Sequence, residues 1–293
     1  MNIADRVEAL RVLGWEKIRQ NEPAEAIERF DEALAIVEDE SQAELITIYK
    51  AFALVADGRT DGEVLQLPRI VMRRRTPRHL FLAAYSLMYR FRLDQEFERA
   101  GFYGRLALEA SEAVTDENWK PIVLTELGNV AVFDSRFNEA VAYYDEAIGL
   151  LGDTPEDAYK RAFMKQNIGY CQLLLDNHET GIDLIHEAIR ALKESGGEGF
   201  VAESYIDLCL GYLETDEYDK ARHYGELGLE LAKEDRQVRN AHYLLGEVAH
   251  KSGDIDKAVE HFDHLATYYP DFPHLKDLLL AIDLRSMVNL KLS

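Results

Sequence analysis

Residues 124–147 read LTELGNVAVFDSRFNEAVAYYDEA, and this stretch decides the fold. A small residue, Gly128, is followed twelve positions later by a second small residue, Ala140, with polar residues 134–136 between them. Two antiparallel helices touch near their crossing point, where only a small side chain lets the backbones come close. The polar residues between them supply helix-end and N-cap chemistry. The stretch therefore predicts a helical hairpin.

The small residue that opens the second helix recurs along the chain, at Ala26, Ala100, Ala140, Gly181, Ala221 and Ala258. The intervals are 74, 40, 41, 40 and 37 residues, and the first is twice 37. A degenerate repeat therefore belongs between the first two positions, with one helix near Ile46–Ala56 and a second near Asp61–Arg74 around Gly62. The sequence predicts seven repeats in total.

The pattern resembles the tetratricopeptide repeat, whose signature is W-x2-L-G-x2-Y, then A-x3-F-x2-A, then P. The first segment carries it as Leu10, Leu13 and Gly14 followed by Ala26, Phe30 and Ala33. The resemblance implies an all-α, right-handed α-solenoid in a single domain over residues 1–293. Degenerate repeats are expected at about 45–110, and an amphipathic capping helix at about 274–292. The lengthened repeats are similar to those of bacterial peptide-sensing regulators and of kinesin light chain.

The composition excludes several classes of protein. With 47% hydrophobic and 30% charged residues, the chain of 293 residues can form a continuous core, which argues against disorder. The net charge of -21 repels phosphate backbones and acidic membranes, so neither nucleic acid nor a membrane is expected as partner. No apolar run reaches the roughly 18 residues needed to span a bilayer. Cys171 and Cys209 fit buried, reduced thiols, and we expect a cytoplasmic protein.

Catalytic constellations are missing from the sequence. It contains no G-x-S-x-G, no G-x-x-x-x-G-K-[ST] and no H-E-x-x-H. His261 and His264 share a helical face as metal ligands would, but no cysteine pair or carboxylate frame accompanies them. We therefore expect no enzymatic activity, no cofactor and no metal site.

The first helices of stacked hairpins line a concave groove, where such proteins usually take peptides or partner helices. Counting from the small residue of each first helix gives the positions expected to face this groove. An asparagine amide carries donors and an acceptor, so it can hold the main chain of a peptide. Asn129 and Asn167 match such clamping asparagines in the chaperone adaptors and peptide sensors that the repeat resembles. The expected binding residues are Asn129, Asn167, Tyr170, Asp207, Tyr243 and Glu247.

The charge at the expected groove indicates the kind of ligand. Where the chaperone adaptors place basic residues to hold a carboxylate, this sequence has Glu203 and Asp207. That favours a ligand carrying Lys, Arg or a free amine. The opposite interpretation, that asparagines on solvent-facing helices have no function, stays open.

Arginines concentrate between residues 59 and 105, where ten arginines face five acidic residues. The planar fork of arginine suits bidentate contact with carboxylate or phosphate. This segment is either a docking patch for an acidic partner or an internal tie to the acidic C-terminal half, while the net charge disfavours a nucleic-acid site. The arginines assigned to the basic patch are Arg73, Arg74, Arg75 and Arg78.

These observations predict a non-catalytic adaptor or scaffold that binds a peptide or partner protein, preferably basic, in the concave groove. The alternative is a peptide-sensing regulator resembling the bacterial quorum regulators. Those regulators carry an N-terminal effector module, whereas the repeats here begin by about Val7, which disfavours the alternative. The apolar run Leu278–Ile282 leaves self-association through the C-terminal helix open.

Overall fold

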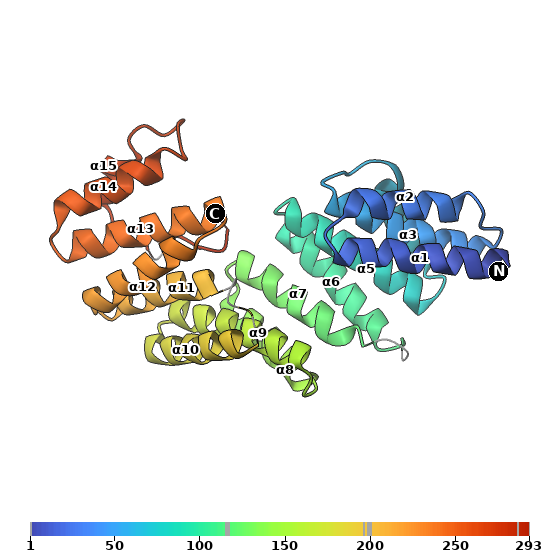
Figure 1. Cartoon of the computed structure of the whole chain (residues 1–293), viewed down its shortest axis with the longest axis horizontal. Coiled ribbons are helices and arrows are strands. Elements are labelled where there is room, and N and C mark those ends of the chain that lie inside the picture. The colour runs from blue at the N-terminus through green and yellow to red at the C-terminus, as the bar shows by residue number, and fades with distance from the viewer. Residues whose placement is uncertain (1, 115–117, 196, 198–200, 286, 293) are drawn as a thin grey trace. The chain divides into compact units, whose positions relative to one another are not determined.

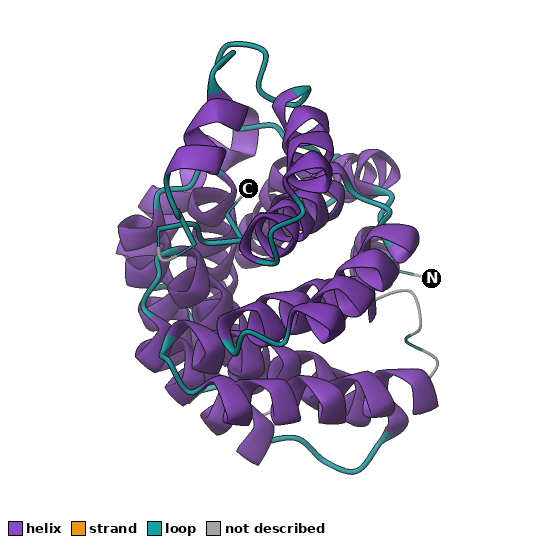
Figure 2. Cartoon of the chain, turned by 90° about the vertical axis from the view of Figure 1, so that its left-hand side faces the viewer, coloured by secondary structure: helices purple, strands orange, loops and turns teal. Residues whose placement is uncertain are grey.

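The computed structural model describes residues 2–114, 118–195, 197, 201–285 and 287–292. Every element in these ranges is helical, and they contain no strand (Figure 2). The chain folds as two compact units, residues 1–130 and 131–293, with the boundary inside helix α7. The predicted all-α fold of helical repeats is confirmed. The single domain over residues 1–293 stays a prediction.

Unit 1 holds the N-terminal helices. Neighbouring helices in it pack side by side, and ring contacts of Trp15, Tyr49, Phe52 and Tyr85 join three of them. Its elements are α1 (Ile3–Arg19), α2 (Pro23–Leu34), α3 (Glu40–Ala56), the 3-10 helix η1 (Gly62–Gln66), α4 (Leu67–Arg73), α5 (Pro77–Leu93), α6 (Phe97–Ser111) and most of α7 (Lys120–Phe133).

Unit 2 holds the remaining helices, drawn from green to red in Figure 1. Here α9 packs on α10, α11 on α12 and α13 on α14, and the first helices α9, α11 and α13 also contact one another in series. Its elements are α8 (Phe137–Gly149), α9 (Pro155–Leu174), α10 (His178–Glu194), α11 (Val201–Glu214), α12 (Tyr218–Leu231), α13 (Asp235–Lys251), α14 (Ile255–Ala266) and α15 (Leu275–Ala281).

The twelve-residue spacing of small side chains has the expected physical cause. A Cβ atom added to Gly169 of α9 would lie 3.0 Å from the carbonyl oxygen of Gly181 on α10. The reverse addition, at Gly181, would bring a Cβ atom to 2.8 Å from the carbonyl oxygen of Gly169. The two backbones therefore touch where the sequence places its smallest residues, because any larger side chain would hold them apart.

The turn between the two helices of a repeat uses a residue in the left-handed backbone conformation. Such residues stand two positions after the end of the first helix of a pair, and the conformation suits Asn, Asp and Gly because their side chains are short or absent. Asp176 has φ 61°, and Asp216 has φ 57°. The other members of this set are Asn21, Gly58, Gln95, Ser135 and Gly253.

The degenerate repeat lies where its spacing predicted, but its second helix is broken. Helix α3 (Glu40–Ala56) contains the expected first helix. The expected helix Asp61–Arg74 is instead η1 followed by α4, with Pro68 in the first turn of α4. Proline has no N–H to donate, so a continuous helix cannot run through this position without losing a hydrogen bond. With this pair included, the described helices follow one another along the sequence in the predicted order of seven pairs.

The C-terminal helix is shorter than expected. A helix does follow the last pair and packs on α14, but α15 ends at Ala281, whereas the sequence pattern predicted a helix to about residue 292. Ile282 adopts an extended conformation, and residues 282–292 form no helix in their described part. In the described ranges, no helix combines the length and apolar character needed to cross a bilayer.

Candidate peptide-binding site

The end of the chain lies on the first helices of unit 2. Residues 282–292, called here the C-terminal segment, turn back from α15 and contact α9, α11 and α13. In Figure 1 the C-terminus stands beside α11 and α13. The segment therefore occupies helices that the sequence assigned to ligand binding.

The main chain of Leu290 is held by three side chains. Its N–H donates to the hydroxyl of Tyr170 at 3.0 Å. Its carbonyl oxygen accepts from Asn240 Nδ2 at 2.7 Å and from Arg236 Nη1 at 3.4 Å. Because both main-chain groups of one residue are bound, this grip does not depend on the identity of its side chain.

Asn289 fixes a turn and anchors it at the same time. Its Oδ1 accepts from the N–H of Lys291 at 3.1 Å and from the Tyr170 hydroxyl at 3.0 Å. Its Nδ2 donates to the carbonyl oxygen of Val132 at 2.7 Å and to Ser135 Oγ at 3.1 Å. An Asn side chain that bonds the backbone two residues onward is a stable turn, and this turn aims Lys291 at α11.

The ammonium of Lys291 lies between two carboxylates of α11. Its Nζ is 2.6 Å from Glu203 Oε1 and 2.9 Å from both carboxylate oxygens of Asp207. It also lies 4.5 Å from the centre of the Tyr170 ring, at cation–π distance. The lysine side chain is only 7% exposed, so this charge is stabilised almost entirely by protein groups.

The acidic pair is held by more than the lysine. Arg236 forms two hydrogen bonds with Glu203, at 2.9 and 3.0 Å, and Gln166 Nε2 donates to Asp207 at 2.6 Å. Against the effect of burial, Lys291 and Arg236 lower the pKa of Glu203 to about 2. Burial raises the pKa of Asp207 to about 6, although Lys291 acts in the opposite direction. Because the ammonium of Lys291 contacts both carboxylates, the acidic pair matches the cationic charge that it faces.

We call the surface that receives the C-terminal segment the docking face. Each of the three first helices supplies two polar residues to it, four positions apart, so that both project on one side of their helix. Its residues are Gln166 and Tyr170 of α9, Glu203 and Asp207 of α11, and Arg236 and Asn240 of α13.

A second anchor holds the beginning of the C-terminal segment. Asp283 lies 2.8 Å from Lys251 Nζ of α13, and Arg285 Nη1 lies 3.1 Å from Glu214 Oε1 of α11. Asp283 and Arg285 are also paired with each other, at 2.7 Å. The hydrogen bonds from Arg285 and Lys251 hold the pKa of Asp283 far below its ordinary value, although burial opposes them.

Two buried polar groups of α13 lie near this second anchor. The hydroxyl of Tyr243 and Oε1 of Glu247 are buried without a hydrogen-bond partner. Burial, with a further contribution from Asp283, raises the pKa of Glu247 to about 7. The cause is the cost of burying a carboxylate whose Oε1 has no hydrogen-bond donor.

The six binding residues expected from the sequence have different outcomes. Tyr170 and Asp207 contact the C-terminal segment directly, whereas Tyr243 and Glu247 lie near its second anchor. Asn167 is buried on α9, and none of the described hydrogen bonds to the segment comes from it. Asn129 is half-buried and belongs to unit 1.

The expectation that these positions face solvent is wrong for the five in unit 2, which are between 0% and 7% exposed. The C-terminal segment is one physical reason, because it lies over Tyr170 and Asp207. Two of the three side chains that hold the main chain of Leu290, those of Asn240 and Arg236, were not predicted from the sequence. Their four-residue spacing on one helix face was the available signal.

Three arginines of the basic patch pair within unit 1. Arg75 lies 2.7 Å from Glu40 and 3.0 Å from Glu44, and Arg73 lies 3.1 Å from Glu44. Both acidic partners stand on α3, and Glu44 is only 8% exposed. Arg78 lies over the ring of Trp119, at 5.8 Å from its centre. These ties run to neighbouring helices of the same unit, whereas the sequence reasoning considered a tie to the acidic C-terminal half.

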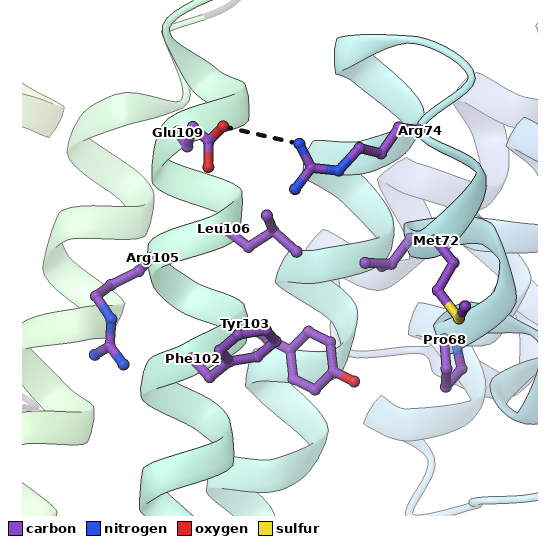
Figure 3. A pocket seen from close by; sticks show the side chains of 9 residues that line it. Pro68, Met72, Arg74, Phe102, Tyr103, Arg105, Leu106 and Glu109 are labelled. Atoms are coloured by element: carbon purple, nitrogen blue, oxygen red, sulfur yellow. Dashed lines mark ion pairs between the residues drawn. The ribbon is translucent and has the colours of Figure 1, made fainter.

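Arg74 borders a shallow apolar pocket between α4 and α6 (Figure 3). It reaches Glu109 across the pocket at 3.9 Å. The side chains of Met72 and Phe102 beside it are 83% and 57% exposed, which is unusual for such large apolar groups.

The histidines of the last repeat form a ring cluster. His242 Nδ1 lies 3.0 Å from His261 Nδ1, and the rings of His242 and His264 are 3.9 Å apart. Burial lowers the pKa of His242 to about 4, so this ring is neutral at physiological pH. Within the described ranges, no group of three or more His, Cys, Asp or Glu residues is placed to hold a metal ion.

Comparison with known proteins places these features in a family context. Residues 240–272, which span most of α13 and all of α14, match the tetratricopeptide repeat model. No curated protein matches the chain. The apo form of RapI has a TM-score of 0.71 and 16% identity, with 89% of this chain and 76% of RapI covered.

Two similar structures contain bound partners. A Rap protein complexed with competence and sporulation factor has a TM-score of 0.69 at 17% identity, covering 96% of this chain and 79% of that one. NprR in complex with its cognate peptide NprX has a TM-score of 0.69 at 14% identity, covering 95% and 80%. The chain therefore has the fold of tetratricopeptide repeat proteins and carries their sequence pattern in its last pair of helices.

Proposed function

We propose that this protein is a non-catalytic adaptor or regulator that binds a peptide, or a segment of a partner protein, on the docking face of unit 2. One observation carries the proposal: Tyr170 and Asn240 hold the N–H and the carbonyl oxygen of a single residue, Leu290. Side chains that satisfy both main-chain groups of one residue are suited to any peptide that reaches them.

The charge of the docking face supports a basic ligand. Glu203 and Asp207 form an acidic pair that already holds one ammonium, that of Lys291. An acidic ligand would add negative charge to a buried site, which costs free energy through repulsion and desolvation. A ligand with Lys, Arg or a free amine fits the same position, as the sequence predicted.

The similar structures support peptide binding as the class of function. The Rap protein and NprR were determined in complex with competence and sporulation factor and with the cognate peptide NprX, respectively. Two free, buried cysteines and the absence of a membrane-spanning helix in the described ranges fit action in the cytoplasm.

The test is peptide binding by the full chain, measured by fluorescence anisotropy with twelve-residue peptides that carry either lysine or glutamate. We expect lysine peptides to bind and glutamate peptides to fail. Measured in a chain that carries Lys291→Met, so that the chain's own ammonium does not compete, Asp207→Asn should weaken lysine-peptide binding by about tenfold or more, because a charged hydrogen bond is lost. The matched control is Asp219→Asn, whose carboxylate is fully exposed on α12. Equal binding of both peptide classes, or no effect of Asp207→Asn, would refute the assignment of this face.

A peptide-sensing regulator is the second candidate, favoured by the similarity to the Rap protein and NprR. A sensor should change its dimensions when it binds a lysine peptide, whereas a static adaptor should not. Small-angle scattering with and without a saturating peptide separates the two candidates.

A further inference from the structure

The C-terminal segment buries few apolar side chains in the core of unit 2. Leu290 is its deeply buried apolar side chain, at 2% exposed. Met287 is 80% exposed and Ile282 is 49% exposed. The segment is held mainly by polar contacts, and a peptide from another molecule could replace such contacts group for group.

Three consecutive residues make most of these contacts, and each does so through different chemistry. Asn289 forms the turn and its anchor, Leu290 offers its main chain, and Lys291 places its ammonium on α11. The first and third positions are read through polar side-chain atoms, and the second carries a side chain that is only 2% exposed, which favours an aliphatic residue there. The order of an amide, an aliphatic residue and a lysine therefore describes what the docking face selects.

The docking face is poorly suited to remaining empty. Without Lys291, two buried carboxylates would lie close together. Among the described contacts, Glu203 would keep its hydrogen bonds with Arg236, and Asp207 would keep only the one from the neutral Gln166. An uncompensated buried charge is costly, so the face requires a cation from some source. In this structure the chain supplies that cation itself.

Accepting the proposed function, we propose that the docking face recognises peptides with an Asn–aliphatic–Lys turn. The chain's own Asn289–Leu290–Lys291 is an intramolecular copy of that ligand, and an incoming peptide displaces it. The copy is tethered to α15, so its effective concentration at the face is high, typically in the millimolar range for a short linker. Binding of a free peptide is then weakened by the fraction of molecules whose segment is docked.

The test uses a labelled peptide with the sequence of residues 282–293, IDLRSMVNLKLS, and the full chain. Lys291→Met in the chain removes the tethered cation but leaves the docking face intact. We expect this variant to bind the peptide at least about tenfold more tightly than the original chain does. The matched control is Lys276→Met, since Lys276 pairs with Asp263 on α14 away from the docking face, and its affinity should equal that of the original chain.

Two further measurements keep the result interpretable if Lys291→Met destabilises unit 2. Asn289→Ala in the chain removes the turn anchor and retains the lysine, and it should shift peptide affinity in the same direction by a smaller factor. A peptide carrying the Lys291→Met change should bind every variant more weakly than the original peptide. Trypsin cleavage after Arg285 reports release of the segment and should be faster in both chain variants.

The contrary outcomes separate this inference from the proposed function. Equal affinity of the original chain and both variants would overturn displacement while leaving peptide binding in place. No binding to a variant whose segment is released, as trypsin cleavage reports, would overturn both. If the peptide instead dissociates a dimer seen by light scattering, the bound segment comes from a second copy, and the intramolecular assignment is overturned.

Discussion

Lys291 and Asp207 are 84 positions apart in the sequence, and the lysine ammonium lies 2.9 Å from both carboxylate oxygens of the aspartate. Each charge is nearly inaccessible to water, at 7% and 1% exposed. Two buried charges of opposite sign therefore hold the C-terminal segment on α11. The pair therefore links the stability of unit 2 to the position of the C-terminal segment.

The first prediction concerns this ion pair. Asp207→Asn should lower the free energy of unfolding by about 2–3 kcal/mol, because a buried ion is left with one partner fewer. This loss of stability is smaller than is usual for a broken buried ion pair, because Glu203 still contacts Lys291. Chemical denaturation followed by circular dichroism measures it. The exposed control Asp219→Asn should change stability by less than about 0.5 kcal/mol, and an equal loss in both variants would contradict the prediction.

The second prediction concerns the hydroxyl of Tyr170. Tyr170→Phe keeps the ring beneath Lys291 but removes the bonds to Asn289 and Leu290. Losing two hydrogen bonds of about 1 kcal/mol each makes local opening of the segment easier, so amide exchange in residues 287–292 should be about thirtyfold faster. Hydrogen exchange with mass spectrometry measures this rate. The control is Tyr212→Phe, whose hydroxyl bonds His186, and unchanged protection of the segment in Tyr170→Phe would contradict the prediction.

The third prediction concerns pH. The pKa of Glu247 is raised to about 7 by burial and by Asp283, while Arg285 and Lys251 oppose the shift. Because the folded state binds the Glu247 proton more tightly than the unfolded state does, the protonated carboxyl adds to the free energy of unfolding at low pH. This contribution is lost as the pH rises through 7 and the carboxyl ionises. Between pH 6 and 8 this loss amounts to about 1 kcal/mol.

Glu247→Gln isolates that contribution from other titrating groups such as Asp207, whose pKa is also raised, and His242, whose pKa is lowered. The difference in melting temperature between the original chain and Glu247→Gln should change from pH 6 to pH 8 in favour of the variant. Parallel curves across this range would show that Glu247 does not titrate there.

The fourth prediction concerns the contact between α9 and α10. Gly169→Ala should destabilise the chain by about 1–3 kcal/mol, because its Cβ would lie 2.6 Å from Ile185 Cγ1. Thermal unfolding measures the loss. Gly149→Ala is the control, since a Cβ added there meets nothing within 4 Å, and it should leave the melting temperature equal or higher. Equal behaviour of the two variants would argue against close helix contact at Gly169.

Much of the repeat pattern could be predicted because its cause is local. The twelve-residue spacing of small side chains placed the helix pairs, including the degenerate one around Gly62. The spacing did not reveal the break of that pair's second helix at Pro68, although proline chemistry was a signal for it. The acidic character of α11 at Glu203 and Asp207 was also visible, and it led to the expectation of a basic ligand.

The sequence by itself determined the all-helical repeat, which follows from the three- and four-residue periodicity of a helix, and it identified Tyr170 and Asp207 of the docking face but not Arg236 or Asn240. Only the tertiary structure decided that the last residues leave the helix and occupy the docking face. Asn289 finds its partners at Val132, Ser135 and Tyr170, up to 157 positions away. Contacts at such separation outweigh local helix propensity, which amounts to less than about 1 kcal/mol per residue, and no local pattern encodes them.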